Sequence, residues 1–268
     1  MSSCCTAGFQ WDGKPVGKET KLANLDTYVS GENKDAAVLI VHDVFGWTLT
    51  NVRLLADHYA SEAGVTVYVP DFFGGEIVTP DMMENPDETK RLDIGAFMGR
   101  HSKDIRGPEI FACAKALKQE LGFKKVGAIG FCYGGWAVFR LGAKGKPSCE
   151  TDRSRSTYKR SADELEGNNL VDCISMAHPS GLEKSEIDNV SVPVQICAPE
   201  IDPIFTPELK EHANKVIPEL KVEYDYQYFP GLVHGFATRG EVNNPTQKNG
   251  LERAKNAAVY WFRQHLSS

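Results

Sequence analysis

Short apolar runs rich in β-branched residues alternate along this chain with segments of helical periodicity. Runs of this kind are typical of strands that are buried on both faces. We expect strands at Ala36–Val41, Val65–Val69, Val126–Phe131, Leu170–Met176, Val192–Ala198 and Val222–Phe229. Helical spacing predicts helices over Thr50–Glu62, Ile105–Leu121, Trp136–Ala143, Glu208–Ile217 and Glu252–Leu266. The alternation predicts an α/β fold, with a mostly parallel sheet and helices on both of its faces.

Three segments depart from this alternation. Residues 1–35 predict an antiparallel lead-in hairpin, with a turn at Trp11-Asp12-Gly13-Lys14. Residues 72–103 are polar, and we expect them to lie near the functional face. Residues 144–169 carry charges of both signs, which is typical of a solvated surface excursion. None of these segments has the character of a linker, so the sequence predicts one domain over residues 1–268.

Composition and charge exclude several classes of protein. Hydrophobic residues make up 41% and charged residues 25% of the chain, which excludes a wholly disordered, fibrous or coiled-coil protein. The 30 basic residues against 36 acidic ones give a net charge of −6, without the basic surface of a nucleic-acid-binding protein. No apolar run reaches the roughly 20 residues that span a bilayer. We therefore expect neither a nucleic-acid partner nor a membrane span.

The seven cysteines do not form a disulfide framework, because their number is odd and they are scattered over a long chain. The first 17 residues lack the basic and apolar regions of a secretory signal. We therefore expect reduced thiols and a location in the cytosol. The pair Cys4-Cys5 is expected to be inert, because no second cluster of metal ligands accompanies it.

The strongest local signal is Gly130-Phe131-Cys132-Tyr133-Gly134-Gly135, between an expected strand and an expected helix. The pattern G-x-C-x-G places a nucleophile at a sharp strand-to-helix turn, and its glycines permit the backbone crowding of that turn. A helix N-terminus and a partner histidine would both favour a reactive thiolate at Cys132. The alternative from this pattern alone is a buried structural cysteine beside a packing turn.

Two partners for such a nucleophile follow in the chain order nucleophile, acid, histidine, which is typical of enzymes with this turn. Asp202 lies just after the strand expected at Val192–Ala198, and His234 lies in a glycine-flanked loop after the next strand. Glu200 is the rival acid, two residues before Asp202. His178 also follows a strand, but it precedes the acid, so it fits pocket lining or packing better than the role of the base. The other histidines have no comparable context: His42, His58, His101, His212 and His265.

Several motifs spread over the chain point to one known family. They are Cys4-Cys5-Thr6 with Gly8-Phe9-x-Trp11-x-Gly13, His42-Asp43-Val44-Phe45-Gly46, Pro70-Asp71-Phe72-Phe73-Gly74-Gly75, the turn at 130–135, Ala177-His178-Pro179-Ser180, and His234-Gly235-Phe236-Ala237-x-Arg239-Gly240. The chain resembles the dienelactone hydrolase family of α/β-hydrolases, and specifically its fungal branch. The likeness covers nearly the whole chain, and it includes the family's use of cysteine in place of serine.

The resemblance implies an α/β-hydrolase fold and a hydrolase that opens a small lactone or cleaves a small ester through a thiol-acyl enzyme, as a carboxymethylenebutenolidase does. Cys132, Asp202 and His234 would form its catalytic triad. Acyl transfer also needs two preset donors for the oxyanion. The backbone N–H of Tyr133 is one, and by resemblance the backbone N–H of Val44 is the other. This chemistry needs neither a metal nor an organic cofactor.

The resemblance also indicates residues that shape the substrate site. Arg239 is the counterpart of an arginine that holds the substrate carboxylate in the family, and Arg91 is a weaker candidate for a second one. Four aromatic residues are available to line an apolar pocket, and each of them also fits the core: Phe45, Trp47, Tyr133 and Phe236.

Asp43 stands where the family often has a glutamate near the nucleophile, and two roles are open for it. A carboxylate close to Cys132 would disfavour the thiolate and raise the pKa of the cysteine. Aspartate is one methylene shorter than glutamate, so the alternative is a carboxylate that organises the oxyanion loop without touching the sulfur.

Two further functions stay open, because a fold does not determine its substrate. The first is a hydrolase that tailors a polyketide or another secondary metabolite. The second is a non-catalytic α/β-hydrolase fold that binds a small molecule as a receptor or carrier, although an intact triad argues against it. In every case the expected partner is a small molecule. The sequence leaves the oligomeric state open, a homo-oligomer included.

Overall fold

A computed structural model describes residues 11–79, 82, 93–144 and 169–267. Its strands are β1 Lys18–Leu22, β2 Leu25–Ser30, β3 Ala36–Val41, β4 Thr66–Pro70, β5 Lys125–Phe131, β6 Cys173–Ala177, β7 Val194–Ile201 and β8 Tyr224–Val233. Over these residues the strands form one sheet in the spatial order β1-β2-β4-β3-β5-β6-β7-β8. β2 pairs antiparallel with β1 and with β4, and every other pair is parallel. The mostly parallel sheet that the sequence predicts is confirmed.

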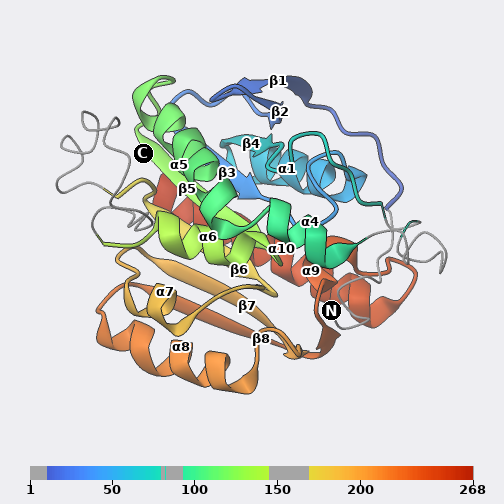
Figure 1. Ribbon diagram of the computed structural model, residues 1–268, viewed down its shortest axis with the longest axis vertical. Helices are drawn as coiled ribbons and strands as arrows, with labels where there is room; N and C mark the ends of the chain where they lie inside the picture. The colour runs from blue at the N-terminus through green and yellow to red at the C-terminus, as the bar shows by residue number, and fades with distance from the viewer. Residues whose placement is uncertain (1–10, 80–81, 83–92, 145–168, 268) are drawn as a thin grey trace.

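The described helices are α1 Thr50–Ala63, α4 Ile94–Arg100, α5 Lys103–Gln119, α6 Gly134–Leu141, α7 Lys184–Asp188, α8 Pro207–Glu219, α9 Phe236–Arg239 and α10 Pro245–Leu266. They cover both faces of the sheet (Figure 1). On one face α1 packs against α10, and on the other α5 packs against α6, with α7 and α8 continuing that layer. None of the helices described here is long and apolar enough to cross a membrane.

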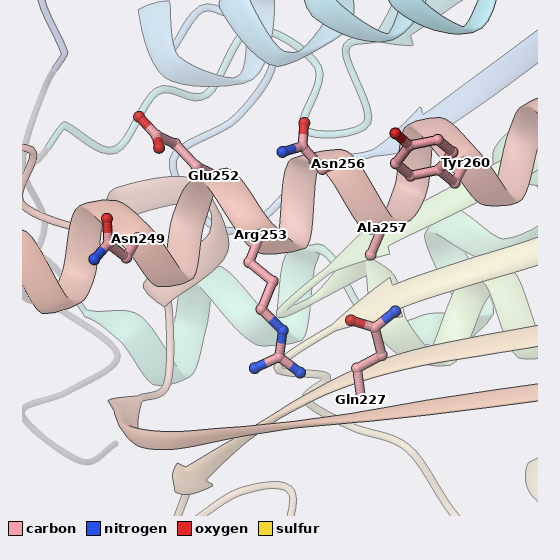
Figure 2. A pocket seen from close by; sticks show the side chains of 7 residues that line it. All are labelled: Gln227, Asn249, Glu252, Arg253, Asn256, Ala257 and Tyr260. Atoms are coloured by element: carbon pink, nitrogen blue, oxygen red, sulfur yellow. The ribbon is translucent and has the colours of Figure 1, made fainter.

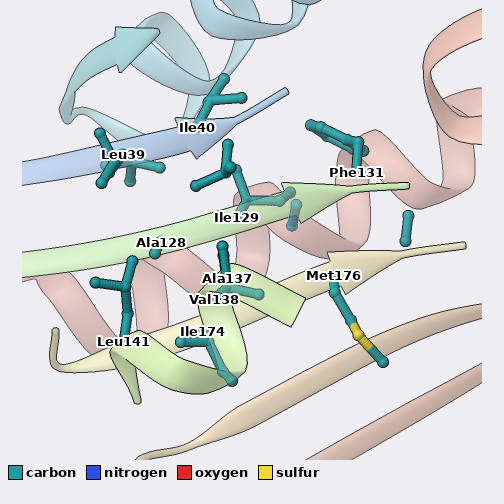
Figure 3. Packing of buried hydrophobic residues seen from close by; sticks show 14 of the residues in the cluster. Leu39, Ile40, Ala128, Ile129, Phe131, Ala137, Val138, Leu141, Ile174 and Met176 are labelled. Carbon is teal, nitrogen blue, oxygen red and sulfur yellow. The ribbon is translucent and has the colours of Figure 1, made fainter. Parts of the chain in front are cut away.

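The central strands are buried on both faces. Every residue of β3 and of β6 is buried, and so is every residue of β5 except Lys125. Figure 3 shows side chains of these three strands packed together and against Val138 and Leu141 of α6. Burial contributes about 25 cal/mol for each Å² of apolar surface removed from water. A continuous core of this kind holds the carboxyl ends of the strands, where the candidate residues lie, in fixed positions.

All the expected strands and helices are present, and all but one have shifted bounds. β3 coincides with its prediction, whereas α10 begins at Pro245, well before the expected Glu252, because the Asn244 side chain caps its first turn. The sequence does not predict α4, α7 and α9. These helices have 7, 5 and 4 residues, which is too short for helical periodicity to show.

The lead-in hairpin is present, but the prediction of its turn at residues 11–14 is wrong. β1 and β2 pair up to Leu22 and Leu25, so the turn consists of Ala23 and Asn24. Both have positive φ, 48° and 68°, as a type I′ hairpin turn requires. Asparagine accepts that conformation readily but alanine does not. In the sequence, Gly13 is therefore a stronger signal of a turn than the pair Ala23-Asn24.

The polar segment 72–103 lies partly against the turn at residues 130–135, which contains Cys132. Phe73 contacts the ring of Tyr133 with centroids 5.2 Å apart. The Tyr133 hydroxyl donates to the backbone carbonyl of His101 at 2.7 Å. The part of this segment that contains Arg91 lies outside the described residues, as do residues 145–168 of the second polar segment.

Candidate active site

Cys132 lies at the sharp turn between β5 and α6. Its backbone has a φ of 47°, a left-handed conformation that is uncommon for a residue with a side chain. A Cβ atom added at Gly130 would collide with the carbonyl oxygen of Gly134, and one added at Gly134 would collide with that of Val41. The two glycines therefore let the turn approach its own helix and the end of β3. This crowding explains the spacing of G-x-C-x-G.

Asp202 and His234 meet at the carboxyl ends of β7 and β8. Ile201 pairs with Val233 in the ladder, which places the two following residues side by side. Nδ1 of His234 lies 2.9 Å from Oδ2 of Asp202, and both side chains are 0% exposed. Oδ1 of Asp202 accepts two backbone N–H groups at 2.9 and 3.0 Å. A carboxylate held in this way keeps the proton on Nδ1 and leaves Nε2 as the nitrogen that exchanges a proton.

Glu200, the rival acid, has another partner. Its carboxylate is exposed and accepts the backbone N–H of Gly231 at 2.7 Å. The ladder of β7 with β8 is irregular between Pro199 and Ile201, beside this residue. The structure therefore brings Asp202, and not Glu200, to the histidine.

The side chains of Cys132 and His234 shift each other's pKa. Burial raises the pKa of the Cys132 thiol, but the interactions with His234 and Arg239 together outweigh burial, and the net pKa lies below its usual value. Burial lowers the pKa of His234, but the interactions with Asp202 and Cys132 outweigh it, and the net pKa is raised. Nε2 of His234 has no well-formed hydrogen bond among the described residues. These shifts favour a thiolate beside an imidazolium.

The two expected oxyanion donors have free backbone N–H groups. Within the described ranges, neither Val44 nor Tyr133 donates its N–H to a protein acceptor. His42 holds the loop before Val44, because its Nδ1 lies 2.8 Å from the carbonyl of Asp43 and its Nε2 accepts the N–H of Phe72 at 3.3 Å. Burial lowers the pKa of His42, which keeps it neutral in this structural role.

Asp43 has the contacts of a residue that organises the oxyanion loop. Its Oδ1 accepts the backbone N–H of Phe45 at 3.0 Å. Its Oδ2 accepts the Thr238 hydroxyl at 2.9 Å and lies 3.2 Å from Nε of Arg239. None of these described contacts is with the sulfur of Cys132. The Asp43 charge acts on that sulfur from a distance, as the smallest of the influences on its pKa.

Arg239, the expected clamp for a substrate carboxylate, lies beside a carboxylate of the protein. Its side chain is 1% exposed in the ion pair with Asp43, and its guanidinium lies 4.8 Å from the centroid of the Phe45 ring. Gly235 makes room for it, since a Cβ there would lie 2.6 Å from the guanidinium. The geometry therefore favours a structural role for this arginine.

Most of the aromatic residues expected to line a pocket are packed in the core. Phe45, Tyr133 and Phe236 are buried, whereas Trp47 is half-buried. His178 is also buried, and its ring lies 5.0 Å from the ring of His234. Its contacts fit the packing role rather than that of a base.

Ser180 is a residue of the site whose role the sequence did not indicate. Its Oγ lies 3.5 Å from Sγ of Cys132. It follows β6, which neighbours β5 in the sheet, and parallel neighbours end at the same edge. The position of Ser180 just after a strand end was the available signal.

A groove of the described residues lies away from these side chains. It runs between β8 and α10, has a volume of about 500 Å³, and is lined by Gln227, Arg253 and Tyr260 among others (Figure 2). No member of the expected triad lines it. We therefore assign it no part in the chemistry.

Comparison with known proteins decides the family. The profile of the dienelactone hydrolase family matches residues 25–266. The chain belongs to the dienelactone hydrolase family. This membership makes it a carboxylic ester hydrolase with the α/β-hydrolase fold, as the motifs predict.

Relatives of this dienelactone hydrolase family member match nearly its whole length. The carboxymethylenebutenolidase homologue of Homo sapiens is 30% identical, over 98% of this chain and 96% of its own. A hydrolase of Aspergillus violaceofuscus is 28% identical, over 99% of this chain and 97% of its own. The crystal structure of dienelactone hydrolase from Anabaena variabilis matches with a TM-score of 0.57 at 16% identity, over 95% of this chain and 99% of its own. The structural match supports the fold.

Proposed function

We propose that this protein hydrolyses a small lactone or ester through a thioester on Cys132, with His234 carrying the proton and Asp202 orienting His234. The observation that carries the proposal is the buried contact of His234 with Asp202 at 2.9 Å, beside a cysteine whose pKa that histidine lowers. Perturbed groups of this kind gather at catalytic sites. A fold that only binds a ligand has no need of a thiolate at a strained turn.

The reaction consists of two acyl transfers. The Cys132 thiolate attacks the carbonyl carbon, and a sulfur–carbon bond forms while negative charge moves to the carbonyl oxygen. The N–H groups of Val44 and Tyr133 donate to this oxyanion. As the oxyanion collapses, the carbon–oxygen bond of the ester breaks, and the leaving oxygen takes the proton of His234. Water then attacks the thioester, gives a proton to His234, and releases the acid and the thiolate.

Selective alkylation tests the nucleophile. Brief treatment with iodoacetamide, followed by mass spectrometry, is expected to label Cys132 far faster than Cys113, Cys173 and Cys197. Burial raises the pKa of Cys113 and Cys197 to about 12, and it raises the pKa of Cys173 as well, so these three stay protonated at neutral pH. Labelling of Cys132 at the rate of these buried thiols would contradict the proposal and favour a non-catalytic binder.

A substrate panel tests the finer class of hydrolase. It contains small lactones, neutral aryl esters, and dienelactone isomers with and without the free carboxylate. Turnover of the dienelactones supports a carboxymethylenebutenolidase-like activity. A rapidly alkylated Cys132 without turnover of any member of the panel would favour an enzyme that tailors a larger secondary metabolite.

Arg239→Ala is expected to lower the turnover of carboxylated and neutral substrates by similar factors. The substitution leaves the Asp43 carboxylate buried without this counter-charge, at a cost of about 3 kcal/mol in the free energy of unfolding. The loop that carries Val44 also loses an anchor. Denaturant unfolding and kcat/KM on both substrate types measure the two effects.

The matched control for Arg239→Ala is the same change combined with Asp43→Asn. Removing both charges is expected to recover much of the lost stability, because the two residues are in contact and their effects are not additive. A loss confined to carboxylated lactones would instead establish Arg239 as the substrate clamp.

A further inference from the structure

The chain leaves β6 and wraps the nucleophile turn. The backbone N–H of Cys132 donates to the carbonyl of Ala177 at 3.3 Å, and the backbone N–H of Ser180 donates to the carbonyl of Cys132 at 2.7 Å. Between these two bonds, Pro179 packs so close to Gly135 that a Cβ added there would collide with the proline. The turn and the segment after β6 are therefore locked together at three points.

His178 gives this segment its sharp bend. Its φ is 41°, which is costly for a residue with a side chain and persists only where the surrounding structure holds it. Its imidazole is buried, and neither ring nitrogen has a hydrogen-bond partner in the described part of the chain. Burial, followed by the charges of His234 and Arg239, holds its pKa well below the usual value, so the ring is neutral. Backbone strain of this kind is concentrated at functional sites.

The bend delivers the Ser180 hydroxyl to the nucleophile. Oγ of Ser180 lies 3.5 Å from Sγ of Cys132, within the range of a hydrogen bond to sulfur. Ser180 is half-buried and Cys132 is buried. A thiol can donate or accept, but a thiolate carries no proton. With the thiolate present, the hydroxyl is the donor.

We propose that Ser180 is a further catalytic residue, whose hydroxyl donates a hydrogen bond to the Cys132 thiolate and holds the sulfur in its attacking position. This inference rests on the proposed function, because it requires Cys132 to be the nucleophile. Charge leaves the sulfur as it bonds to the carbonyl carbon, so the hydrogen bond is strongest in the resting enzyme. Its effect is a larger fraction of thiolate at neutral pH, with a slightly less nucleophilic sulfur.

Other groups act on the same sulfur from neighbouring elements. His234 after β8 and Arg239 of α9 lower the pKa of Cys132, and Asp43 after β3 raises it. The ring of His178 contacts the ring of His234 and is itself neutral. Ser180 differs from all of these because it is a neutral donor. Removing its hydroxyl changes no charge in the site, so its contribution can be measured separately.

The test is the pH profile of Cys132 alkylation by iodoacetamide in the wild-type protein and in Ser180→Ala. Loss of the hydroxyl is expected to raise the midpoint of the profile by about one pH unit, since a hydrogen bond to a charged group has that magnitude. The alkaline plateau is expected to stay or to rise by about threefold, because a thiolate of higher pKa is the better nucleophile. A merely structural role would lower the plateau.

Two variants control this experiment. Ser180→Thr keeps the hydroxyl and is expected to keep the wild-type midpoint. Ser185→Ala removes a hydroxyl from an exposed position of the neighbouring helix α7, and it is expected to leave the whole profile unchanged.

Three outcomes would count against these proposals, and they are distinguishable. An unchanged midpoint in Ser180→Ala, with wild-type thermal unfolding, overturns the role of Ser180 and leaves Cys132 as the nucleophile. An equal loss of plateau rate in Ser180→Ala and Ser180→Thr overturns it as well, by showing a structural role. If the proposed function itself is wrong, Cys132 of the wild-type protein reacts no faster than the buried thiols.

Discussion

Cys132→Ala and His234→Ala are each expected to abolish most of the hydrolysis, with kcat falling by roughly 10⁴- to 10⁶-fold. Without the sulfur no thioester forms, and without the imidazole the leaving oxygen loses its proton donor. The double variant is expected to be scarcely worse than either single one, because members of a triad act as a unit. Initial rates on a small lactone or an aryl ester measure the effect.

Folding must be separated from chemistry in these variants, because both side chains are buried. Cys113→Ala is the matched control, since Cys113 is also fully buried but lies on α5 and carries a raised pKa. Cys113→Ala is expected to keep its activity, whatever loss of stability denaturant unfolding shows for it. A near-normal rate in Cys132→Ala would end the assignment of the nucleophile.

Asp202→Asn is expected to lower kcat by about 10⁴-fold, whereas Glu200→Gln is expected to change it by less than a few-fold. Two backbone N–H groups already donate to Oδ1 of Asp202. In the asparagine variant the amide oxygen therefore takes that place, and the amide NH₂ faces Nδ1 of His234. The imidazole is then held with its proton on Nε2, which is the wrong tautomer for a base. Glu200→Gln is the matched control, since that side chain is exposed and bonds to Gly231.

The same pair of variants gives a pH signature. Contact with Asp202 raises the pKa of His234, and His234 in turn lowers the pKa of Cys132. Removing the carboxylate leaves less positive charge on His234 at neutral pH, so the alkylation profile of Cys132 is expected to move to higher pH. Glu200→Gln is expected to leave the profile in place. If the two results were exchanged, Glu200 would be the acid.

The parts of the fold that could be predicted leave a local pattern in the sequence. β3 is a run of apolar residues because the strand is buried on both faces. The turn at Cys132 has the pattern G-x-C-x-G because crowding requires glycine at positions 130 and 134. The turn at Ala23 and Asn24 leaves no comparable pattern. The location in the cytosol and the single domain over residues 1–268 stay predictions.

Which side chains meet could be predicted only in part. Chain order and strand ends reduced the candidates for the acid to two neighbours. The pairing of Ile201 with Val233, after the irregularity in β7, is what brings Asp202 rather than Glu200 to His234. That register depends on the whole ladder, and it cannot be derived from the residues near position 200.

By itself the sequence determined the alternating α/β architecture and the sharp turn at Cys132, because burial and backbone crowding act on residues that are close together in the chain. Only the tertiary structure decided that Arg239 contacts Asp43 and that Ser180 lies beside Cys132. These contacts join residues at the ends of different strands. Their distances depend on how those ends converge at one edge of the sheet, and a local sequence pattern does not predict that convergence.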